Sequence, residues 1–345
     1  MKEQIQNSFF IYFEKLGYIK KQASKLVSNK PDILFTNSGM VQFANNFSVE
    51  NTQINEKFIT AQPCCRISGK HDDLNNIGYS PNHLTTFTML GHFEFTNADI
   101  YKTMSYTLGF LKKIGINNEN LYITVHPNIP DIDSVLLLAK QHNLEVVYLE
   151  DNKWSAGKDM PWGRTVEIFY KDKLHDLEIW NFVMVMGVGD IQYKNYKLDT
   201  GGGAERLRSI INGSFDVLSH AKNYISSAEI EINKIIEDHI QTIDLLSKEI
   251  EPSNKKQGYV LRMIMRRLIT IEHLYDQKVY SSKHYDNESA VFNKALKTSY
   301  KMFEKELISR KSSLLKIMTY INQTYGAPVK LLISYMVKKI WSDET

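Results

Sequence analysis

Up to about residue 215, short apolar runs alternate with polar turns along the chain. Runs of about four to eight residues that are rich in β-branched and aromatic side chains are typical of strands. The pattern predicts strands at 58–67, 84–95, 121–126, 144–149, 164–170 and 177–187. Apolar residues at three-to-four spacing predict helices near 3–16, 99–114 and 132–143.

The pattern changes after Gly213, where the strand-like runs stop. Residues 223–250, 259–275 and 289–310 carry apolar side chains at helical spacing. Strand-rich sequence followed by helical sequence is typical of an α+β domain joined to a helical one. We therefore expect an α+β domain over residues 1–215 and an all-helical domain over residues 216–345.

Composition narrows the class of protein. The chain has 345 residues, of which 43% are apolar and 23% charged, which is enough to bury a large core. No apolar stretch approaches the roughly 20 residues that a membrane-spanning helix needs. Cys64 and Cys65, the only two cysteines, are adjacent, so neither a disulfide framework nor a cysteine-rich zinc site is available. We expect a cytoplasmic protein without zinc and without a membrane partner.

The stretch 64–95, CCRISGKHDDLNNIGYSPNHLTTFTMLGHFEF, places many charged side chains between two predicted strands. If the strands form an antiparallel pair, Arg66, His83 and Phe87 project toward one face. Cationic groups for phosphate beside a ring for a base form a nucleotide platform. The alternative is a solvated hairpin in which Phe87 is core and Arg66 pairs with Asp72 or Asp73.

A second cluster, LDTGGGAERLRSII at 198–211, has three consecutive glycines before a helix start. Glycines let a ligand approach the backbone, and a helix N-terminus attracts anions. The segment is not a dinucleotide fingerprint, because the third glycine of G-x-G-x-x-G is missing. Asp199 either caps a turn here or pairs with a ligand cation.

In this order the segments resemble the catalytic part of the alanyl-tRNA synthetase family, which are class II aminoacyl-tRNA synthetases. The similarity is carried by FTNSGMVQFANNF (35–47), by the 64–95 stretch, by DNKWSAG, EIFY and EIWN, and by DTGGGAERL. NKKQGYVLRMIMRR (254–267) and TYGAPV (324–329) extend it into the family's helical tRNA-recognition region. The resemblance implies a class II antiparallel sheet flanked by helices, and the ligation of alanine to alanine tRNA through an alanyl-adenylate.

The resemblance also implies roles for individual residues toward ATP. Arg66 would bridge the α-phosphate and the alanine carboxylate, and Phe87 would stack on adenine. His83 and Arg206 would bind the terminal phosphates, where Mg²⁺ is expected because it prefers oxygen ligands. Lys70 would lie near the adenylate or the incoming tRNA end.

The same resemblance implies which residues bind alanine. Asp199 would pair with the amino group, Trp154 would close the space beyond the methyl group, and Asn181 would orient the substrate. Gly201 and Gly203 would border the ATP, and Gly201 would also border alanine.

In the helical part, Arg262 and Arg266 form a basic edge suited to the phosphates of a tRNA acceptor stem. The alternative is a solvated helix face. Asn254 matches an asparagine that reads a G·U pair from the wide minor groove in the family, although it also stands where a helix cap would be. Gln323 replaces the aspartate that the family has before TYG, so dependence on the G·U pair is open.

Residues 216–345 also hold 20 Lys and Arg against 16 Asp and Glu, whereas residues 1–215 hold 22 against 23.

An alanine pocket excludes larger side chains but does not strongly reject glycine or serine, so a second check is expected. Full-length relatives have an editing domain with a zinc site and a C-terminal dimerisation domain. We expect neither in this chain, and hence no editing in cis and a monomer. The alternative to an active ligase is a synthetase-like paralogue that binds ATP, alanine or RNA without charging tRNA, since Gln323 and Asn82 depart from the family pattern.

Overall fold

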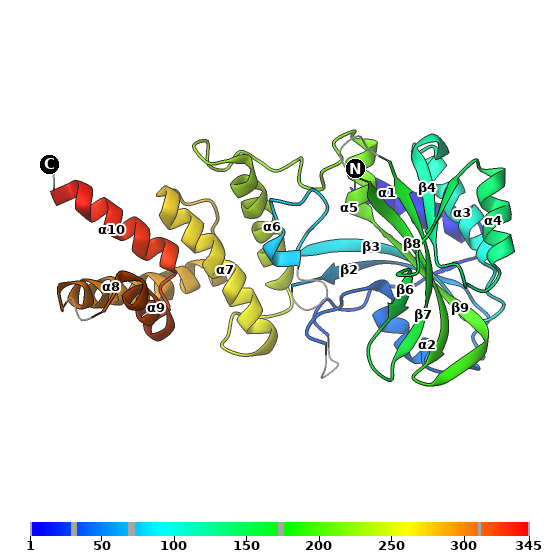
Figure 1. The fold of residues 1–345 in the computed structure, drawn as a ribbon, viewed down its shortest axis with the longest axis horizontal. Helices are drawn as coiled ribbons and strands as arrows, with labels where there is room; N and C mark the ends of the chain where they lie inside the picture. The colour runs from blue at the N-terminus through cyan, green and yellow to red at the C-terminus, as the bar shows by residue number, and fades with distance from the viewer. Residues whose placement is uncertain (1, 29–32, 68–72, 172–175, 310–311, 344–345) are drawn as a thin grey trace. The chain divides into compact units, whose positions relative to one another are not determined.

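The computed structural model describes residues 2–28, 33–67, 73–171, 176–309 and 312–343 (Figure 1). They form two compact units, Met1–His220 and Ala221–Thr345. The boundary expected from the sequence, at 215/216, lies close to this division. Each unit is described by itself below.

The first unit contains one large sheet (Figure 1). Its nine described strands follow the order β1-β2-β3-β9-β8-β7-β4-β5, with β6 paired to β7. All pairs are antiparallel except β1 with β2 and β4 with β5. The mixed, mostly antiparallel sheet confirms the predicted α+β class. The strands are Ile19–Lys20 (β1), Phe58–Cys65 (β2), Thr86–Glu94 (β3), Leu121–Val125 (β4), Glu145–Tyr148 (β5), Lys153–Ser155 (β6), Pro161–Tyr170 (β7), Leu177–Val188 (β8) and Ile191–Gly203 (β9).

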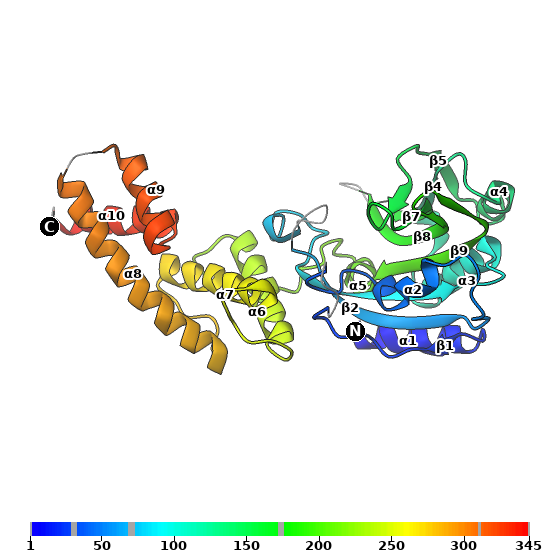
Figure 2. The same ribbon diagram turned by 90° about the horizontal axis from the view of Figure 1, so that it is seen from below.

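Helices cover one face of this sheet. Buried apolar residues of α1, α3, α4 and α5 form a single core cluster with alternate residues of the strands, among them Leu90, Phe182 and Leu198. Figure 2 shows α1 running beside β1 and β2. The helices of this unit are Lys2–Glu14 (α1), Ala44–Phe47 (α2), Ile100–Lys113 (α3), Ile132–Gln141 (α4) and Ala204–Ile211 (α5), with 3₁₀ turns at Gly39–Phe43 (η1), Asp73–Asn75 (η3) and Asn118–Asn120 (η4).

The opposite face of the sheet, called the second face here, carries the intervening strand residues. Strand side chains alternate between faces, so Phe87 and Asp199 lie opposite to Leu90 and Leu198. Part of the second face is covered by η1 and α2, whose Met40, Phe43 and Phe47 pack with Phe93, Val183 and Val185 in a separate apolar cluster.

Strand β9 is the main element that the sequence pattern missed. The three glycines at 201–203 were expected to form a turn or a ligand loop, but they are the last residues of this strand. Its first half alternates irregularly between polar and apolar residues, and glycine is unfavourable in strands. Pairing on both sides, with β3 and β8, overrides that local preference.

The second unit is helical over its described residues, as expected. Residues 223–250 were expected to be helical throughout, but the helix begins only at Ile230. No helix in the described residues is long and apolar enough to span a membrane. Its helices are Ile230–Leu246 (α6), Lys256–Tyr275 (α7), Lys283–Ser309 (α8), Leu314–Tyr325 (α9) and Val329–Asp343 (α10).

Candidate functional site

Three central strands, β3, β8 and β9, bring Phe87, Asn181 and Asp199 to the second face. In β9, Asp199 pairs with Phe93 of β3, and Gly201 pairs with Gly91. On the other side of β9, Gly201 pairs with Asn181 of β8. Residues that pair across antiparallel strands share a face, so Phe87, Asn181 and Asp199 lie on the same side of the sheet.

Arg66 and Phe87 lie next to each other at one end of this face. The Arg66 guanidinium lies 5.0 Å from the centre of the Phe87 ring, within the range of a cation–π contact. Its Nε donates to the carbonyl oxygen of Asn37 at 3.1 Å, and its backbone N–H donates to the carbonyl of Thr85. Arg66 and Phe87 thus lie together at the end of the hairpin, and their roles toward a nucleotide stay predictions.

His83 was expected to project toward the same face as Arg66 and Phe87, but it does not lie on a strand. β3 begins at Thr86, and His83 precedes it in a loop, where its Nδ1 lies 2.6 Å from the hydroxyl of Ser80. The strand begins later than the predicted 84–95 because its pairing with β2 ends at Cys65 and Thr86. Lys70, Asp72 and the side chain of Asp73 lie outside the described residues.

Asp199 has an unusual electrostatic environment. No hydrogen bond or ion pair joins its carboxylate to another described residue, and burial raises its pKa from the ordinary value of 3.8 to about 7. The residue keeps partial solvent contact, so the carboxylate lies beneath an accessible surface. A turn cap is excluded as its role, because Asp199 lies inside β9. Its role toward a ligand cation stays a prediction.

Asn181 is the second acceptor with an unused oxygen on this face. Its Nδ2 donates to Glu167 Oε1 at 3.0 Å and to Glu178 Oε1 at 3.3 Å. These two carboxylates fix which way the amide faces, because only the nitrogen can donate to them. The buried Oδ1 of Asn181 has no hydrogen-bond partner among the described residues. Buried polar atoms are normally paired, so an unpaired one indicates a missing donor.

Glu167 and Glu178 belong to the site although sequence reasoning assigned them no role. Burial and the neighbouring Glu178 raise the pKa of Glu167. Glu178 Oε2 lies 3.3 Å from Arg206 NH1, which also donates to the Glu178 carbonyl. Both glutamates open quoted segments, EIFY and EIWN, and this repeated acidic residue on neighbouring strands was the available signal.

An apolar wall borders the site. Trp154 of β6 pairs with Gly163 of β7 and packs against the cluster that contains Met40, Phe93 and Val183. Val183 is the residue opposite Asp199. The predicted Trp154 and Asp199 are therefore on the same part of the sheet.

The glycines of β9 serve the sheet itself. A Cβ on Gly201 would lie 2.8 Å from the carbonyl oxygen of Leu90, and one on Gly202 would lie 2.3 Å from that of Ile179. On Gly203 the nearest atom would be Arg206 Cγ at 3.6 Å, an ordinary contact. Close approach of the neighbouring strands thus requires the first two glycines.

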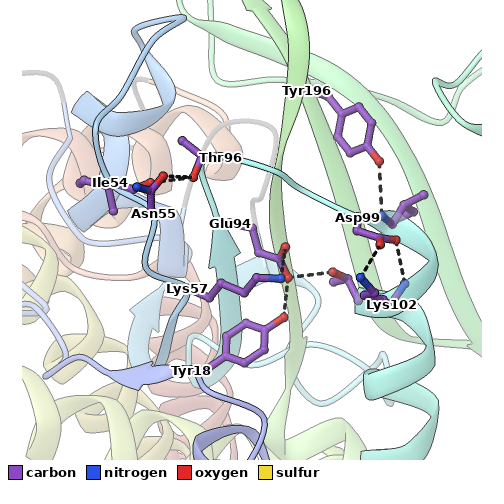
Figure 3. A network of polar contacts seen from close by, with 11 residues as sticks. Tyr18, Ile54, Asn55, Lys57, Glu94, Thr96, Asp99, Lys102 and Tyr196 are labelled. Carbon is purple, nitrogen blue, oxygen red and sulfur yellow. Dashed lines mark hydrogen bonds and ion pairs between the residues drawn. The ribbon is translucent and has the colours of Figure 1, made fainter.

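A further polar network lies on the helix-covered face, away from these residues (Figure 3). The fully buried Glu94 of β3 accepts from Lys57 Nζ at 2.7 Å, from Thr103 Oγ1 at 2.8 Å and from the Tyr18 hydroxyl. A buried carboxylate is stable only when it is fully paired in this way. The network joins α3 and β1 to the sheet.

In the second unit, the predicted RNA-contact residues form a chain of polar contacts. Arg262 Nε and Arg266 Nε donate to the same oxygen of Glu288, Oε1, at 2.8 and 2.6 Å. Arg262 NH1 also donates to Asn254 Oδ1. Asn254 makes no cap of α7, and its side chain is exposed. Gln323 is exposed near the end of α9. Glu288, which organises the two arginines, was not predicted.

The sequence matches the model of a known class of enzyme. Residues 4–283 match the family model of class II (A) tRNA synthetases, which is most of the chain. The chain therefore belongs to the class II (A) tRNA synthetase family.

Curated relatives narrow the similarity further. Over 304 residues the chain is 34% identical to the alanine–tRNA ligase of Legionella pneumophila (strain Lens), an alignment that covers 77% of this chain and 35% of that protein. It is 29% identical to the alanine–tRNA ligase of Francisella philomiragia over 398 residues, which covers 95% of this chain and 46% of that protein. The chain thus spans between about a third and a half of the length of these relatives. The apo histidyl-tRNA synthetase of S. aureus superposes with a TM-score of 0.43 at 10% identity, over 61% of this chain and 67% of that one.

Proposed function

We propose that this chain activates alanine with ATP and transfers it to the 3′ end of alanine tRNA. The observation that carries the proposal is the pair of unused acceptors, the Asp199 carboxylate and Asn181 Oδ1, on the sheet face that also carries Phe87. An α-ammonium group supplies the positive charge and the N–H donors that these two oxygens lack. Membership of the synthetase family and similarity to alanine–tRNA ligases support this reading.

In the first step, a carboxylate oxygen of alanine attacks the α-phosphorus of ATP, and the bond to pyrophosphate breaks. Arg66 lies beside Phe87, so it can neutralise the phosphate while the ring stacks on adenine. Arg206, whose side chain is partly exposed at the start of α5, would bind the terminal phosphates. In the second step, a ribose hydroxyl of the tRNA attacks the carbonyl carbon and AMP leaves.

Mg²⁺ fits the acidic side of the site. Glu167 and Glu178 both accept from Asn181, and burial together with repulsion from Glu178 raises the pKa of Glu167. A hard divalent cation relieves that repulsion and keeps its other positions for water and phosphate oxygens. When bound, it would neutralise charge on the polyphosphate. Among the described residues no group of three or more His, Cys, Asp or Glu side chains could hold a metal alone, so the ligand phosphates would complete such a site.

The site would select the amino acid by the small size of its side chain. Val183 lies opposite Asp199, and Trp154 packs against the same apolar cluster, so a side chain larger than methyl would meet this wall. For RNA, Asn254 with its oxygen held by Arg262 would direct its amide N–H toward acceptors in the minor groove of the acceptor stem.

The test combines ATP–pyrophosphate exchange with aminoacylation of alanine tRNA transcripts that carry G·U or G·C at the third pair. Alanine-dependent exchange and charging are expected, and Asp199→Ala should abolish the exchange while ATP binding remains. Exchange without charging would favour the paralogue that binds its substrates without ligating them. Absence of alanine-dependent exchange would overturn the proposal.

A further inference from the structure

Helix α8 carries a row of lysines along one side. Lys283, Lys294, Lys297, Lys301 and Lys305 are all exposed. At about 100° per residue they fall within a sector of about 80°, and at 1.5 Å per residue they extend over about 33 Å. Figure 2 shows α8 as a long helix with α9 and α10 beside its second half. These five residues are called the lysine row.

The lysine row is not neutralised within the chain. None of its ammonium groups makes an ion pair or hydrogen bond with another described residue. The flanking carboxylates are engaged elsewhere: Asp286 accepts from Lys278 and Ser281, and Glu304 accepts from Lys339 and Tyr335. Aligned like charges repel, so an uncompensated row gains free energy when a polyanion binds it.

The opposite side of α8 carries the buried apolar residues of the helix. Phe292, Leu296 and Phe303 are buried in the second unit. A helix that inserts into a membrane surface needs an available apolar face beside its basic one. Since α8 has buried its apolar face, the lysine row suits a ligand that lies on the surface and presents charge at regular intervals.

We propose that the lysine row binds the phosphodiester backbone of double-stranded RNA. This rests on the proposed function and extends it, because Asn254, Arg262 and Arg266 lie on other elements. Four of the five lysines lie beyond residue 283, where the family match ends. Lysines act as point charges on phosphates, so the row adds affinity without reading sequence.

The test replaces Lys294, Lys297, Lys301 and Lys305 with glutamine together. Binding of an alanine tRNA transcript and of an unrelated RNA duplex is measured against KCl concentration. Because each phosphate that a lysine neutralises contributes about 0.7 to 0.9 to the slope of log K against log salt, the magnitude of the slope should fall by about 3 for both RNAs. KM for tRNA should rise at least tenfold, equally for G·U and G·C stems, with unchanged ATP–pyrophosphate exchange.

Two further variants make the result specific. Glutamine at Lys15, Lys112, Lys113 and Lys140, four exposed lysines of the first unit, removes the same charge elsewhere and should leave the slope unchanged. Arginine at the four row positions keeps the charge and should retain the slope.

An unchanged slope in the glutamine variant would overturn the proposal. Loss of binding to phosphatidylserine vesicles with unchanged RNA binding would also overturn it, and would assign the row to membranes. If the wild type binds RNA with the full slope but never activates alanine, the proposed function fails while the row stands.

Discussion

Asp199 and Asn181 lie diagonally across the β8–β9 pair, since Asn181 is opposite Gly201 and Asp199 is two residues along. Each presents an oxygen without a partner among the described residues. The two carboxylates that hold Asn181 are themselves satisfied by Thr165 and Arg206. The site therefore keeps two acceptors empty inside an otherwise paired network, which is the arrangement that a positively charged ligand completes.

The first prediction concerns pH. Burial raises the pKa of Asp199 to about 7, so below pH 7 the free protein holds this carboxyl in its neutral form. A neutral carboxyl attracts an ammonium group far less, so kcat/KM for alanine should fall about tenfold per pH unit below 7 and level off above it. kcat/KM for ATP should show no such step. Both are measured by ATP–pyrophosphate exchange between pH 5.5 and 8.5.

The same carboxylate should cost stability. Its pKa is higher in the folded state than the ordinary 3.8, so the folded state binds more protons between pH 3.8 and 7. Stability therefore falls as pH rises through that window, and the full cost is present above pH 7. At pH 8, Asp199→Asn should melt at or above the wild-type temperature while losing alanine activation. Asp190→Asn, an exposed control in the β8–β9 turn, should change neither.

The second prediction concerns Arg66 and Phe87. Lysine at position 66 keeps the charge but loses the planar fork that binds two oxygens and packs on the ring. Arg66→Lys should lower kcat for exchange about 10- to 100-fold. Phe87→Leu should instead raise KM for ATP about tenfold and leave KM for alanine unchanged. Arg208→Lys, which removes contacts to the Val217 carbonyl and His220, is the matched control and should preserve both constants.

The third prediction separates two adjacent glycines. A methyl group at 202 would lie 2.3 Å from a carbonyl oxygen and 2.6 Å from the Trp180 ring, whereas at 203 it meets nothing closer than 3.6 Å. Gly202→Ala should lower the free energy of unfolding by about 1–3 kcal/mol or more, and Gly203→Ala should change it by less than about 0.5 kcal/mol. Urea titrations measure both. Equal stability of the two variants would contradict this account of the triple glycine.

Local pattern was sufficient for most of the first unit. The predicted strand at 177–187 is observed as Leu177–Val188, because its apolar residues are buried on both faces and it lies between Asp176 and the turn at Gly189 and Asp190. β9 was missed because its stability comes from pairing with β3 and β8, which are distant in sequence. The expected helix at 223–250 starts late for a related reason: Asn233 accepts from the Ile225 N–H and donates to its carbonyl, which holds the preceding segment in a non-helical form.

Candidate site residues could be predicted where the chemistry of one side chain is enough to indicate a role. Arg66, Phe87 and Asp199 were predicted from charge, ring and position, and the structure places the last two on one face, while their roles stay predictions. Residues that act through contacts with other side chains were not predicted. Glu167 and Glu178 became visible only through their shared contact with Asn181, and Glu288 only through the two arginines that converge on it from another helix.

The last prediction concerns Glu288. Its Oε1 accepts from both Arg262 and Arg266, and Arg262 in turn holds Asn254. Glutamine keeps an oxygen acceptor but loses the negative charge that pairs with two partly buried guanidinium groups, so Glu288→Gln should lower the free energy of unfolding by about 1–3 kcal/mol. Because Asn254 then loses its fixed orientation, charging of the G·U transcript should fall about tenfold with normal ATP–pyrophosphate exchange.

A second carboxylate on the same helix provides the control. Glu304 also accepts from two side chains, Lys339 and Tyr335, but it does not contact Asn254. Glu304→Gln should therefore preserve the preference between G·U and G·C stems. If Glu288 acts through Asn254, Glu288→Gln should no longer change the preference between the stems in a protein that already carries Asn254→Ala. The effects of substitutions at residues that contact one another in a chain are not additive. Additive effects measured well below both melting temperatures would mean that Glu288 only stabilises the helices.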